Sequence, residues 1–374
     1  MPRAAMKRRR LHSVLLAGAV VVAACTPLHR RIVEPPRPDR AALEQSDALL
    51  ARAQVRRERF QATGGPSLSF LVLEPRNYQL DYEVLRRDRL FSYRFRVFEP
   101  GEAQAPVGSI MMLHGWSTDG RYLLPWAMRL AGQGYRVIVP DLRNHGRSGK
   151  AAAGFGTREA EDVLALARHL HGRGELPSPV HLFGISYGAV TVLHAAARWN
   201  DDGTGAGLGA VVAMEPFANA ADAIRTSIAG LLQNAPHLRW HERALRSALR
   251  RRYGPDRVER AIDDTGALLA MDLRRFDVGE VMQQVRACVL HVHGRVDTLI
   301  PVGTARALAA RRPRNVYLEL PEDGHFSTTA RADWLAGPLG FWLPVAAGTP
   351  ADANCPPVRL PADPAGILPA EPTR

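Results

Sequence analysis

The chain has 374 residues, of which 46% are hydrophobic and 23% charged. These fractions are ordinary for a globular protein and exclude a largely disordered chain, and the length allows one large domain or two modest ones. The formal net charge is +12, and +7 remains once the five basic residues of segment 1–24 are subtracted. A basic surplus favours anionic surfaces such as lipid headgroups, whereas nucleic acid is a poor alternative because the sequence has no binding motif for it.

The N-terminal segment has the pattern of an export signal. Basic residues up to Arg10 precede an apolar run over residues 11–24, which is too short to span a bilayer, since about 20 apolar residues are needed. The run ends Val22-Ala23-Ala24-Cys25, which resembles the lipobox of bacterial lipoproteins. The resemblance implies cleavage before Cys25 and lipidation of this residue. The residue after Cys25 is Thr26 rather than Asp, as in lipoproteins that are sent to the outer membrane. The resemblance therefore implies an outer-membrane location, with the domain facing the periplasm. An ordinary cleaved signal with a chance Cys is the alternative.

Residues 25–66 are predicted to form a tether and one helix. Residues 25–38 are rich in Pro and Arg, so we expect an extended tether that gives the domain distance from the membrane. In residues 39–60, four apolar residues interrupt a polar face, which predicts an exposed helix. The turn residues Thr63-Gly64-Gly65-Pro66 end it.

Residues 67–343 alternate between short apolar runs and helical patterns, and they are predicted to form one α/β domain. The alternation predicts a mostly parallel central sheet with helices on both faces, and antiparallel strands at its start fit a mixed sheet. Strands are expected at residues 68–73, 82–85, 91–98, 110–113, 137–139, 180–185, 210–214, 289–292 and 316–320, and helices at 121–131, 157–171, 189–199, 304–310 and 330–342.

Two segments depart from this rhythm. Between Glu215 and Arg286 there is no convincing strand, and the apolar residues from Trp240 to Tyr253 follow helical spacing. Residues 216–286 are therefore predicted to form a helical cap inserted between two strands of the sheet. Residues 344–374 are rich in Pro and Ala and are expected to form a poorly ordered tail.

The sequence Gly184-Ile185-Ser186-Tyr187-Gly188 matches G-x-S-x-G, between a predicted strand and a predicted helix. This is the context of a nucleophile elbow, in which a sharp, strained turn exposes the Ser hydroxyl. Side chains at positions 184 and 188 would collide where strand and helix nearly touch. A five-residue string of this kind also arises by chance, and its position between strand and helix is what favours Ser186 as a nucleophile.

An oxyanion hole is predicted from two backbone amides. His114-Gly115-Trp116 closes an earlier apolar strand, where a second oxyanion donor is expected, so the amides of Trp116 and Tyr187 are the candidates. For His114 we expect a side chain that stabilises the turn rather than a catalytic role.

Two further residues complete a candidate triad. Asp297 follows the strand at residues 289–292, where a carboxylate can accept a hydrogen bond from an imidazole and hold its tautomer. His325 follows the next strand, after Gly324, in a loop able to turn the ring inward. The alternatives are a helix-capping Asp and a surface-loop His, and Glu215 is the rival acid. The chain order Ser, Asp, His is that of α/β-hydrolases.

The loops after the early strands carry a family resemblance. Three segments resemble the monoglyceride-lipase and serine-aminopeptidase-like branch of the α/β-hydrolases. They are His114-Gly115-Trp116-Ser117-Thr118-Asp119-Gly120-Arg121-Tyr122, Gly134-Tyr135-Arg136-Val137 and Asp141-Leu142-Arg143-Asn144-His145-Gly146-Arg147-Ser148. The resemblance runs from about residue 68 to 343. It implies a structural role for Asp141, His145 and Ser148 near the oxyanion turn. Asn144 departs from the Gly usual there, and the cap matches no known pattern.

The resemblance implies two-step acyl transfer through Ser186, with no metal or organic cofactor. We expect an ester hydrolase acting on acylglycerols or other small-molecule or lipid esters, held at the membrane through Cys25. A peptidase acting on short peptides and a non-catalytic lipoprotein that kept the fold are the alternatives. The Arg-rich stretch at residues 239–260 could dock on a membrane, although a solvated cap face is the simpler interpretation.

The remaining cysteines and histidines give weaker expectations. Cys288 begins an apolar run, which favours a buried free thiol, although an exported chain could pair it with Cys355. His291 and His293 share one strand face but have no further ligand cluster, so a zinc site is not expected. The sequence does not indicate an oligomeric state.

Overall fold

The structure is a computed structural model that describes residues 27–361 except 79, 88–89, 98–99, 234–246 and 248–252. The predicted signal at residues 1–24, the predicted lipid attachment at Cys25, residues 362–374 and most of the helical pattern from Trp240 to Tyr253 lie outside the described residues. Within the described part of the chain, no helix combines the length and apolarity that crossing a bilayer requires.

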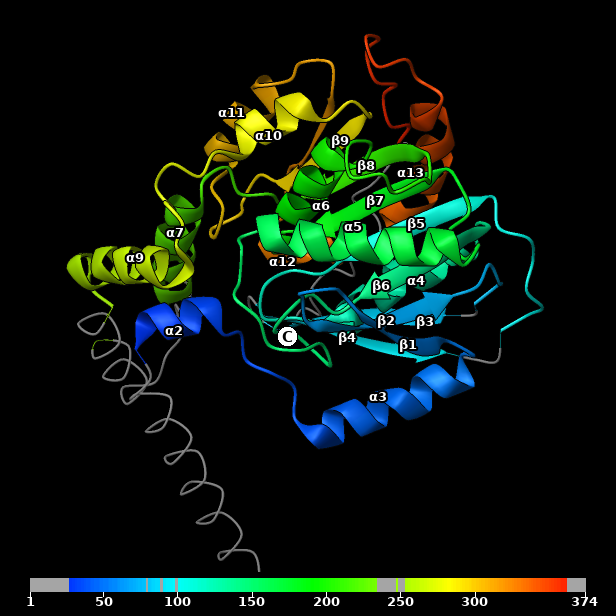
Figure 1. The fold of residues 1–374 in the computed structure, drawn as a ribbon, viewed down its shortest axis with the longest axis horizontal. Coiled ribbons are helices and arrows are strands. Elements are labelled where there is room, and N and C mark those ends of the chain that lie inside the picture. The colour runs from blue at the N-terminus through cyan, green and yellow to red at the C-terminus, as the bar shows by residue number, and fades with distance from the viewer. Residues whose placement is uncertain are drawn as a thin grey trace, which may run out of the picture.

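Eight strands form one mixed sheet in the order β1-β2-β6-β5-β7-β8-β9-β10 (Figure 1). The first two contacts, β1 with β2 and β2 with β6, are antiparallel, and all later ones are parallel. The carboxyl ends of β5 to β10 therefore lie along one edge, where α/β proteins place their sites. The strands are β1 Arg56–Gln61, β2 Ser67–Leu73, β5 Gly108–Leu113, β6 Tyr135–Pro140, β7 Val180–Ile185, β8 Leu208–Met214, β9 Val289–Gly294 and β10 Val316–Leu320.

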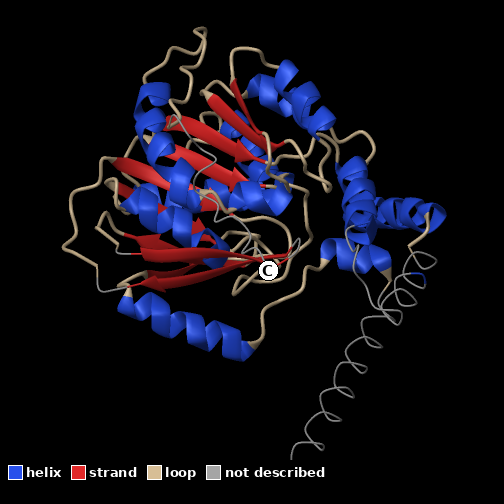
Figure 2. Cartoon of the chain, turned by 180° about the vertical axis from the view of Figure 1, so that it is seen from behind, coloured by secondary structure: helices blue, strands red, loops and turns tan. Residues whose placement is uncertain are grey.

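Helices cover both faces of this sheet (Figures 1 and 2). Alternate residues of β5 point to opposite cores: Met111 and Leu113 pack into one buried cluster, Ile110 and Met112 into the other. The first cluster contains α5 Thr157–Gly172, α6 Tyr187–Arg198 and α11 Val302–Ala310; the second contains α4 Leu124–Ala131, after the 3-10 turn η1 Gly120–Leu123, and α13 Ala332–Ala347. Strands buried on both faces explain the continuous apolar runs in the sequence. The predicted fold class is confirmed.

Most predicted elements lie within a few residues of the observed ones, and the strands at 180–185 and 316–320 coincide with β7 and β10. The two strands predicted at 82–85 and 91–98 are observed as β3 Leu80–Arg87 and β4 Leu90–Val97, which pair with each other in a separate two-stranded sheet. The short helix α12 His325–Thr329 precedes α13.

The helix predicted over residues 39–60 is wrong in its second half. Helix α3 covers Arg40–Arg52, Gln54 then adopts a left-handed φ of 52°, and residues 56–61 form the edge strand β1. No residue of β1 is fully buried, and Phe60 is its one large apolar residue. The apolar alternation that marks a half-buried strand is therefore missing, and the polar sequence was consistent with an exposed helix.

The extended tether predicted over residues 25–38 is also corrected. Helix α2 Leu28–Val33 lies within it and packs against α9 Pro255–Leu269 of the cap. Val33 is buried in the same core cluster as Val258 and Ile262 of α9. This docking, rather than intrinsic helix propensity, explains a helix of only six residues, because isolated short helices are marginal in water.

The described part of the predicted cap is helical, with no strand between β8 and β9. It consists of α7 Ala220–Gln233, α9 and α10 Val278–Gln284. Helices α7 and α9 pack against each other, and α10 packs on α6 of the main domain. Figures 1 and 2 show α2, α7 and α9 together at one end of the molecule.

The tail is ordered further than its composition predicted. Helix α13 continues to Ala347, and residues 348–361 return along the domain. Cys355 forms a disulfide with Cys288, so the predicted free thiol is wrong, although Cys288 is buried as expected. The indole N–H of Trp342 donates to the carbonyl of Pro356, which fastens the tail to α13. The disulfide and this hydrogen bond hold the tail without an apolar periodicity in its sequence, so its composition did not predict the order.

Candidate active site

Ser186 lies at the junction of β7 and α6 in a backbone conformation that is unfavourable for a residue with a side chain. Its φ is 53° and its ψ is −112°. A Cβ at Gly184 would lie 2.2 Å from the carbonyl oxygen of Gly188, and a Cβ at Gly188 would lie 2.3 Å from that of Leu113. Both glycines are therefore required by close backbone contacts, as the sequence predicted, and the tight turn presents the Ser186 hydroxyl at the carboxyl edge of the sheet.

The structure brings Ser186, Asp297 and His325 into one chain of contacts. The Nε2 of His325 lies 3.0 Å from the Oγ of Ser186, and its Nδ1 lies 2.7 Å from the Oδ2 of Asp297. These residues follow β7, β9 and β10, and positions 186 and 325 are 139 residues apart. The convergence follows from the parallel sheet, since the carboxyl ends of its strands meet at one edge.

Asp297 is fixed as a hydrogen-bond acceptor. Its Oδ1 accepts the backbone N–H groups of Leu299, at 2.7 Å, and Ile300, at 2.9 Å, which leaves Oδ2 for the imidazole of His325. Although burial opposes it, the charge and hydrogen bond of His325 lower the pKa of Asp297. The pKa of His325 is raised above its ordinary value of 6.5, because the Asp297 carboxylate outweighs burial, which alone would lower it. The carboxylate thus holds the proton on Nδ1 and makes Nε2 the basic nitrogen facing Ser186.

The amides of Trp116 and Tyr187 are free to act as donors. Neither backbone N–H has a hydrogen-bond partner among the described residues. Tyr187 is the first residue of α6, whose N-terminus favours negative charge. A Cβ placed on Gly115, the residue before Trp116, would lie 3.5 Å from the Cβ of Ser186, so this turn passes directly beside the hydroxyl.

His114 has the turn-stabilising role that the sequence predicted. It is fully buried, its Nδ1 contacts the carbonyl of Gly115, and its Nε2 accepts the N–H of Leu142. Because Nε2 accepts, the hydrogen lies on Nδ1, and both nitrogens are used by the backbone. His114 therefore joins the candidate oxyanion turn to the loop after β6.

That loop, residues 141–149, forms a polar framework. Asp141 accepts the N–H groups of Gly120 and Arg147, and the Ser148 hydroxyl donates to the Asp141 carbonyl. The ring of His145 packs 5.1 Å from that of Trp116. These contacts support the oxyanion turn from behind, and they agree with the structural role that the resemblance implied.

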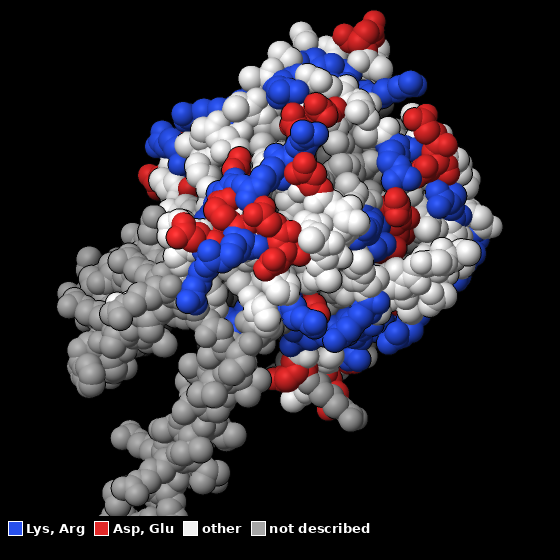
Figure 3. Space-filling view, turned by 60° about the vertical axis from the view of Figure 1, so that its left-hand side comes forward, with Lys and Arg blue, Asp and Glu red and all other residues white. Residues whose placement is uncertain are grey.

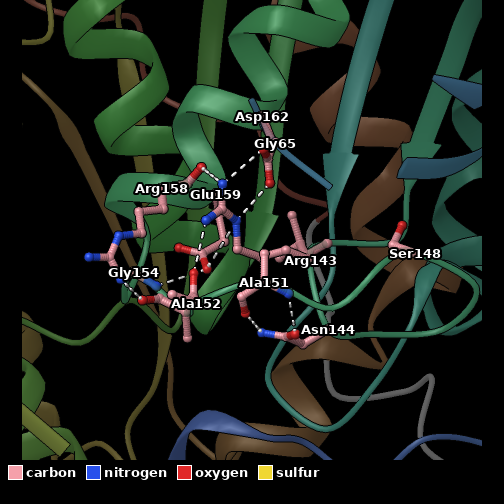
Figure 4. A network of polar contacts seen from close by, with 12 residues as sticks. Gly65, Arg143, Asn144, Ser148, Ala151, Ala152, Gly154, Arg158, Glu159 and Asp162 are labelled. Atoms are coloured by element: carbon pink, nitrogen blue, oxygen red, sulfur yellow. Dashed lines mark hydrogen bonds and ion pairs between the residues drawn. The ribbon is translucent and has the colours of Figure 1, made fainter. Parts of the chain in front are cut away.

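Figure 4 shows the network around the same loop. The guanidinium of Arg143 makes two hydrogen bonds with Asp162 of α5 and one with the carbonyl of Ala152. Asn144, where the resembling branch has Gly, adopts a φ of 70° and exchanges two hydrogen bonds with the backbone of Ala151. Asn is among the few residues that tolerate this conformation, so the departure is accommodated.

A second buried acid–histidine pair lies behind Asp297, and sequence reasoning missed it. The Oε2 of Glu215 lies 2.8 Å from the Nδ1 of His293, and its Oε1 accepts the N–H of Gly294. The Nε2 of His293 faces the carbonyl of Ile300 at 2.9 Å, so it carries a hydrogen. Glu215 and His293 therefore form a fully buried acid–histidine contact. Burial raises the pKa of Glu215 to about 7. The available signal was a Glu and a His that end neighbouring strands.

Donor atoms of Glu215, His293 and Asp297 all lie within 4.8 Å of one another, the one such group found in the described residues. Asp297, however, already accepts two backbone N–H groups and contacts His325. The Nε2 of His293 is committed to a carbonyl. The hydrogen bonds therefore explain the cluster better than a metal would.

Two exposed apolar residues flank the candidate triad in sequence. Val296 and Phe326, the neighbours of Asp297 and His325, are 54% and 47% exposed. A cavity of about 600 Å³ lies between residues 62–66, residues 150–152 and α5, and no residue of the candidate triad lines it.

Comparison with known proteins agrees with this geometry. The sequence model of the alpha/beta hydrolase family matches residues 110–337, more than half of the chain. A pimeloyl-(acyl-carrier protein) methyl ester esterase of Xanthomonas campestris pv. campestris (strain B100) is 26% identical over 251 residues, which cover 62% of this chain and 93% of that protein. The protein of the same name from Stenotrophomonas maltophilia (strain K279a) is 27% identical over 269 residues, covering 66% and 95%.

Among solved structures, the Pyrococcus furiosus esterase Pf2001 superimposes with a TM-score of 0.56 at 16% identity, covering 83% of this chain and 97% of that one. At this identity the likeness shows the fold alone. With the family match and the topology of the sheet, the comparisons lead to one conclusion: the chain belongs to the alpha/beta hydrolase family.

Proposed function

We propose that the protein is a lipid-anchored serine esterase with Ser186 as nucleophile, His325 as general base and acid, and Asp297 as the carboxylate that orients His325. The observation that carries the proposal is the position of His325, whose two nitrogens lie 3.0 Å from Ser186 and 2.7 Å from Asp297. A base between a hydroxyl and a buried carboxylate is the arrangement that activates a weak nucleophile.

The mechanism is acyl transfer in two steps. His325 takes the hydroxyl proton as Ser186 attacks the ester carbonyl, and the amides of Trp116 and Tyr187 stabilise the negative oxygen of the tetrahedral intermediate. The leaving alcohol receives the proton from His325, and an acyl-enzyme remains on Ser186. Water then gives its proton to His325 and attacks the acyl-enzyme, which releases the acid and restores the hydroxyl.

An ester, rather than an amide, is the proposed substrate. The curated relatives at 26% and 27% identity are methyl ester esterases. The loop motifs of the monoglyceride-lipase-like branch and the exposed Val296 and Phe326 beside the triad favour an acylglycerol or another lipid ester. Apolar side chains next to the reacting groups suit an acyl chain.

Export and anchoring belong to the same proposal. The lipobox ending in Cys25 supports lipidation, and Thr26 supports the outer membrane, with the domain facing the periplasm. The disulfide between Cys288 and Cys355 is in accord with this, because such bonds persist mainly in oxidising compartments.

Labelling with a fluorophosphonate tests the nucleophile. We expect wild type and the control Ser247→Ala, which alters an exposed serine, to be labelled, and Ser186→Ala to remain unlabelled. Equal labelling of Ser186→Ala would refute the assignment. A panel of ester and anilide substrates then separates the activities: anilide turnover without ester turnover would replace the esterase with a peptidase.

A further inference from the structure

The proposed anchor lies very close in sequence to a helix that is fixed on the cap. Only Thr26 and Pro27 separate Cys25 from Leu28, the first residue of α2. Three residues of extended chain reach at most about 11 Å. The spacer that the Pro-rich sequence predicted is thus shortened to this distance, because α2 docks on the domain.

Helix α2 is held to cap helix α9, and to Tyr253 just before it, by polar and apolar contacts. The guanidinium of Arg31 donates to the Tyr253 hydroxyl at 2.9 Å, and the Nδ1 of His29 lies 3.5 Å from a carboxylate oxygen of Asp264. The apolar residues of α2, with Val33 fully buried, pack into the core cluster that includes α9. A lipid attached at Cys25 would therefore restrain the cap itself rather than a free tether.

The chain after α2 continues this connection to the catalytic loops. The guanidinium of Arg37 donates to the carbonyls of Asn144, at 3.0 Å, and Ser148, at 2.8 Å. Between them, His145 packs against Trp116, whose amide is the proposed oxyanion donor. Contacts therefore run from the segment after α2, through the loop of residues 144–148, to the turn that holds Trp116.

The cap also reaches the loop of Asp297. A Cβ at Gly230, near the end of α7, would lie 2.4 Å from the carbonyl of Thr298, so α7 crosses directly over that loop. Because α7 packs on α9 and α9 on α2, these contacts place α2 on the cap side of the triad. Val296 and Phe326, which precede Asp297 and follow His325 in the sequence, are exposed.

We propose that the anchor holds the cap side of the domain against the bilayer, so that the triad opens toward the lipid and acts on an ester carried in the membrane. This inference rests on the proposed lipidation of Cys25 and the proposed esterase activity. The proposal does not rest on charge: among the described residues of the cap, basic and acidic side chains pair with one another, as in the contacts of Glu259 with Arg225 and Arg274, and Figure 3 shows both signs interspersed on this side. In this proposal, the short chain between Cys25 and α2 orients the domain on the membrane.

Lengthening the connection tests the proposal. A flexible linker of about 30 Gly and Ser residues between Thr26 and Pro27 leaves the lipobox and α2 unchanged but allows a separation of about 30 Å. Wild type and insertion variant are reconstituted in vesicles of phosphatidylethanolamine and phosphatidylglycerol that carry dioleoylglycerol. Hydrolysis of this ester and of p-nitrophenyl butyrate, which is delivered from water, is measured on each.

We expect the insertion to lower dioleoylglycerol hydrolysis by about tenfold, because the site loses its high local concentration at the surface, and to leave p-nitrophenyl butyrate hydrolysis unchanged. Equal dioleoylglycerol rates in the two proteins would overturn the orientation. Failure of the underlying proposals looks different: a wild type that lacks the lipid by mass spectrometry refutes the anchor, and one that cleaves neither ester refutes the esterase.

A second measurement reads the orientation without activity. A fluorophore is attached to Arg260→Cys, one turn from Asp264 on the exposed surface of α9, or to Phe341→Cys on α13, which packs on the opposite face of the sheet. In the full-length lipidated protein, headgroup nitroxides should quench the label at 260 and spare the one at 341. Equal quenching, or quenching at 341 alone, would contradict the proposal.

Discussion

The substitution Asp297→Asn tests the arrangement of the triad most directly. Its oxygen can still accept the N–H groups of Leu299 and Ile300, so the loop keeps its backbone contacts. Its NH₂ group would then face the Nδ1 of His325, in place of the carboxylate oxygen at 2.7 Å. Because an amide N–H can only donate, Nδ1 must become the acceptor, and the ring hydrogen moves to Nε2. The nitrogen facing Ser186 then carries a hydrogen and cannot accept the hydroxyl proton.

The expected loss is that of the general base with the rest of the site intact. A wrong tautomer in this arrangement costs about 10³- to 10⁴-fold in rate, or roughly 4–5.5 kcal/mol of transition-state stabilisation. The assay is kcat/KM for p-nitrophenyl butyrate, with circular dichroism and the thermal midpoint as measures of folding. KM should change little, since the carboxylate does not contact the acyl group in this mechanism.

Glu215→Gln is the matched control, because it neutralises the neighbouring acid without contacting His325. One oxygen of Glu215 accepts the N–H of Gly294 and the other lies 2.8 Å from the Nδ1 of His293, so this acid faces His293 rather than His325. We expect Glu215→Gln to keep kcat/KM within about tenfold of wild type, since it does not alter the tautomer of His325. If Asp297→Asn retained wild-type activity while Glu215→Gln lost it, the acid of the triad would have been misassigned.

Three further predictions follow from the same contacts. Gly188→Ala places a methyl group 2.3 Å from the carbonyl of Leu113, so we expect lost activity and a stability loss of about 1–3 kcal/mol in urea unfolding; wild-type behaviour would contradict the tight elbow. Cys355→Ser removes the disulfide with Cys288 that closes a loop of 67 residues, and chain entropy predicts that the free energy of unfolding falls by about 4 kcal/mol. Urea unfolding of variant and wild type, each with and without reductant, measures the difference. A difference that is as large with reductant as without it would rule out the disulfide as its cause. The pKa of His325 is raised above 6.5 by its carboxylate partner, against the effect of burial, and only neutral imidazole accepts the hydroxyl proton. The kcat/KM for a soluble ester should therefore fall as pH decreases, with a midpoint above 6.5, and a midpoint below 6.5 would show that burial dominates.

The sheet and the candidate triad could be predicted because their signals are local. Strands covered on both faces require continuous apolar runs, and β7 and β10 begin and end where those runs do. The elbow needs Gly184 and Gly188 at fixed positions beside Ser186, since both approach backbone atoms within 2.3 Å as soon as a Cβ is added. Residues that close such strands meet at one edge whatever the length of the intervening chain, which is why Asp297 and His325 could be assigned.

The parts that could not be predicted depend on contacts between distant segments. Helix α2, residues 28–33, is stabilised by packing against α9, residues 255–269, and its own six residues carry no pattern that predicts a helix. The polar sequence of β1 matches a helix as well as an edge strand. Cys355 lies in a Pro-rich segment without periodicity, and its pairing with Cys288 becomes visible only in three dimensions. Glu215 and His293 lie in contact because β8 and β9 are neighbours.

The predictable elements carry the residues proposed for the reaction, whereas the unpredictable ones are those proposed to select the substrate. The residues proposed to perform acyl transfer follow strands of the sheet, and their arrangement does not depend on which ester is cleaved. The segments that we propose to control access are α2 and the cap helices α7 and α9. Long-range contacts hold α2 and the chain after it, such as Arg31 with Tyr253 and Arg37 with Ser148. Substitutions there should change the preference between membrane-borne and soluble esters while the chemistry at Ser186 continues. On the proposed function, we therefore expect the anchor and the cap, rather than the candidate triad, to decide the specificity of this hydrolase.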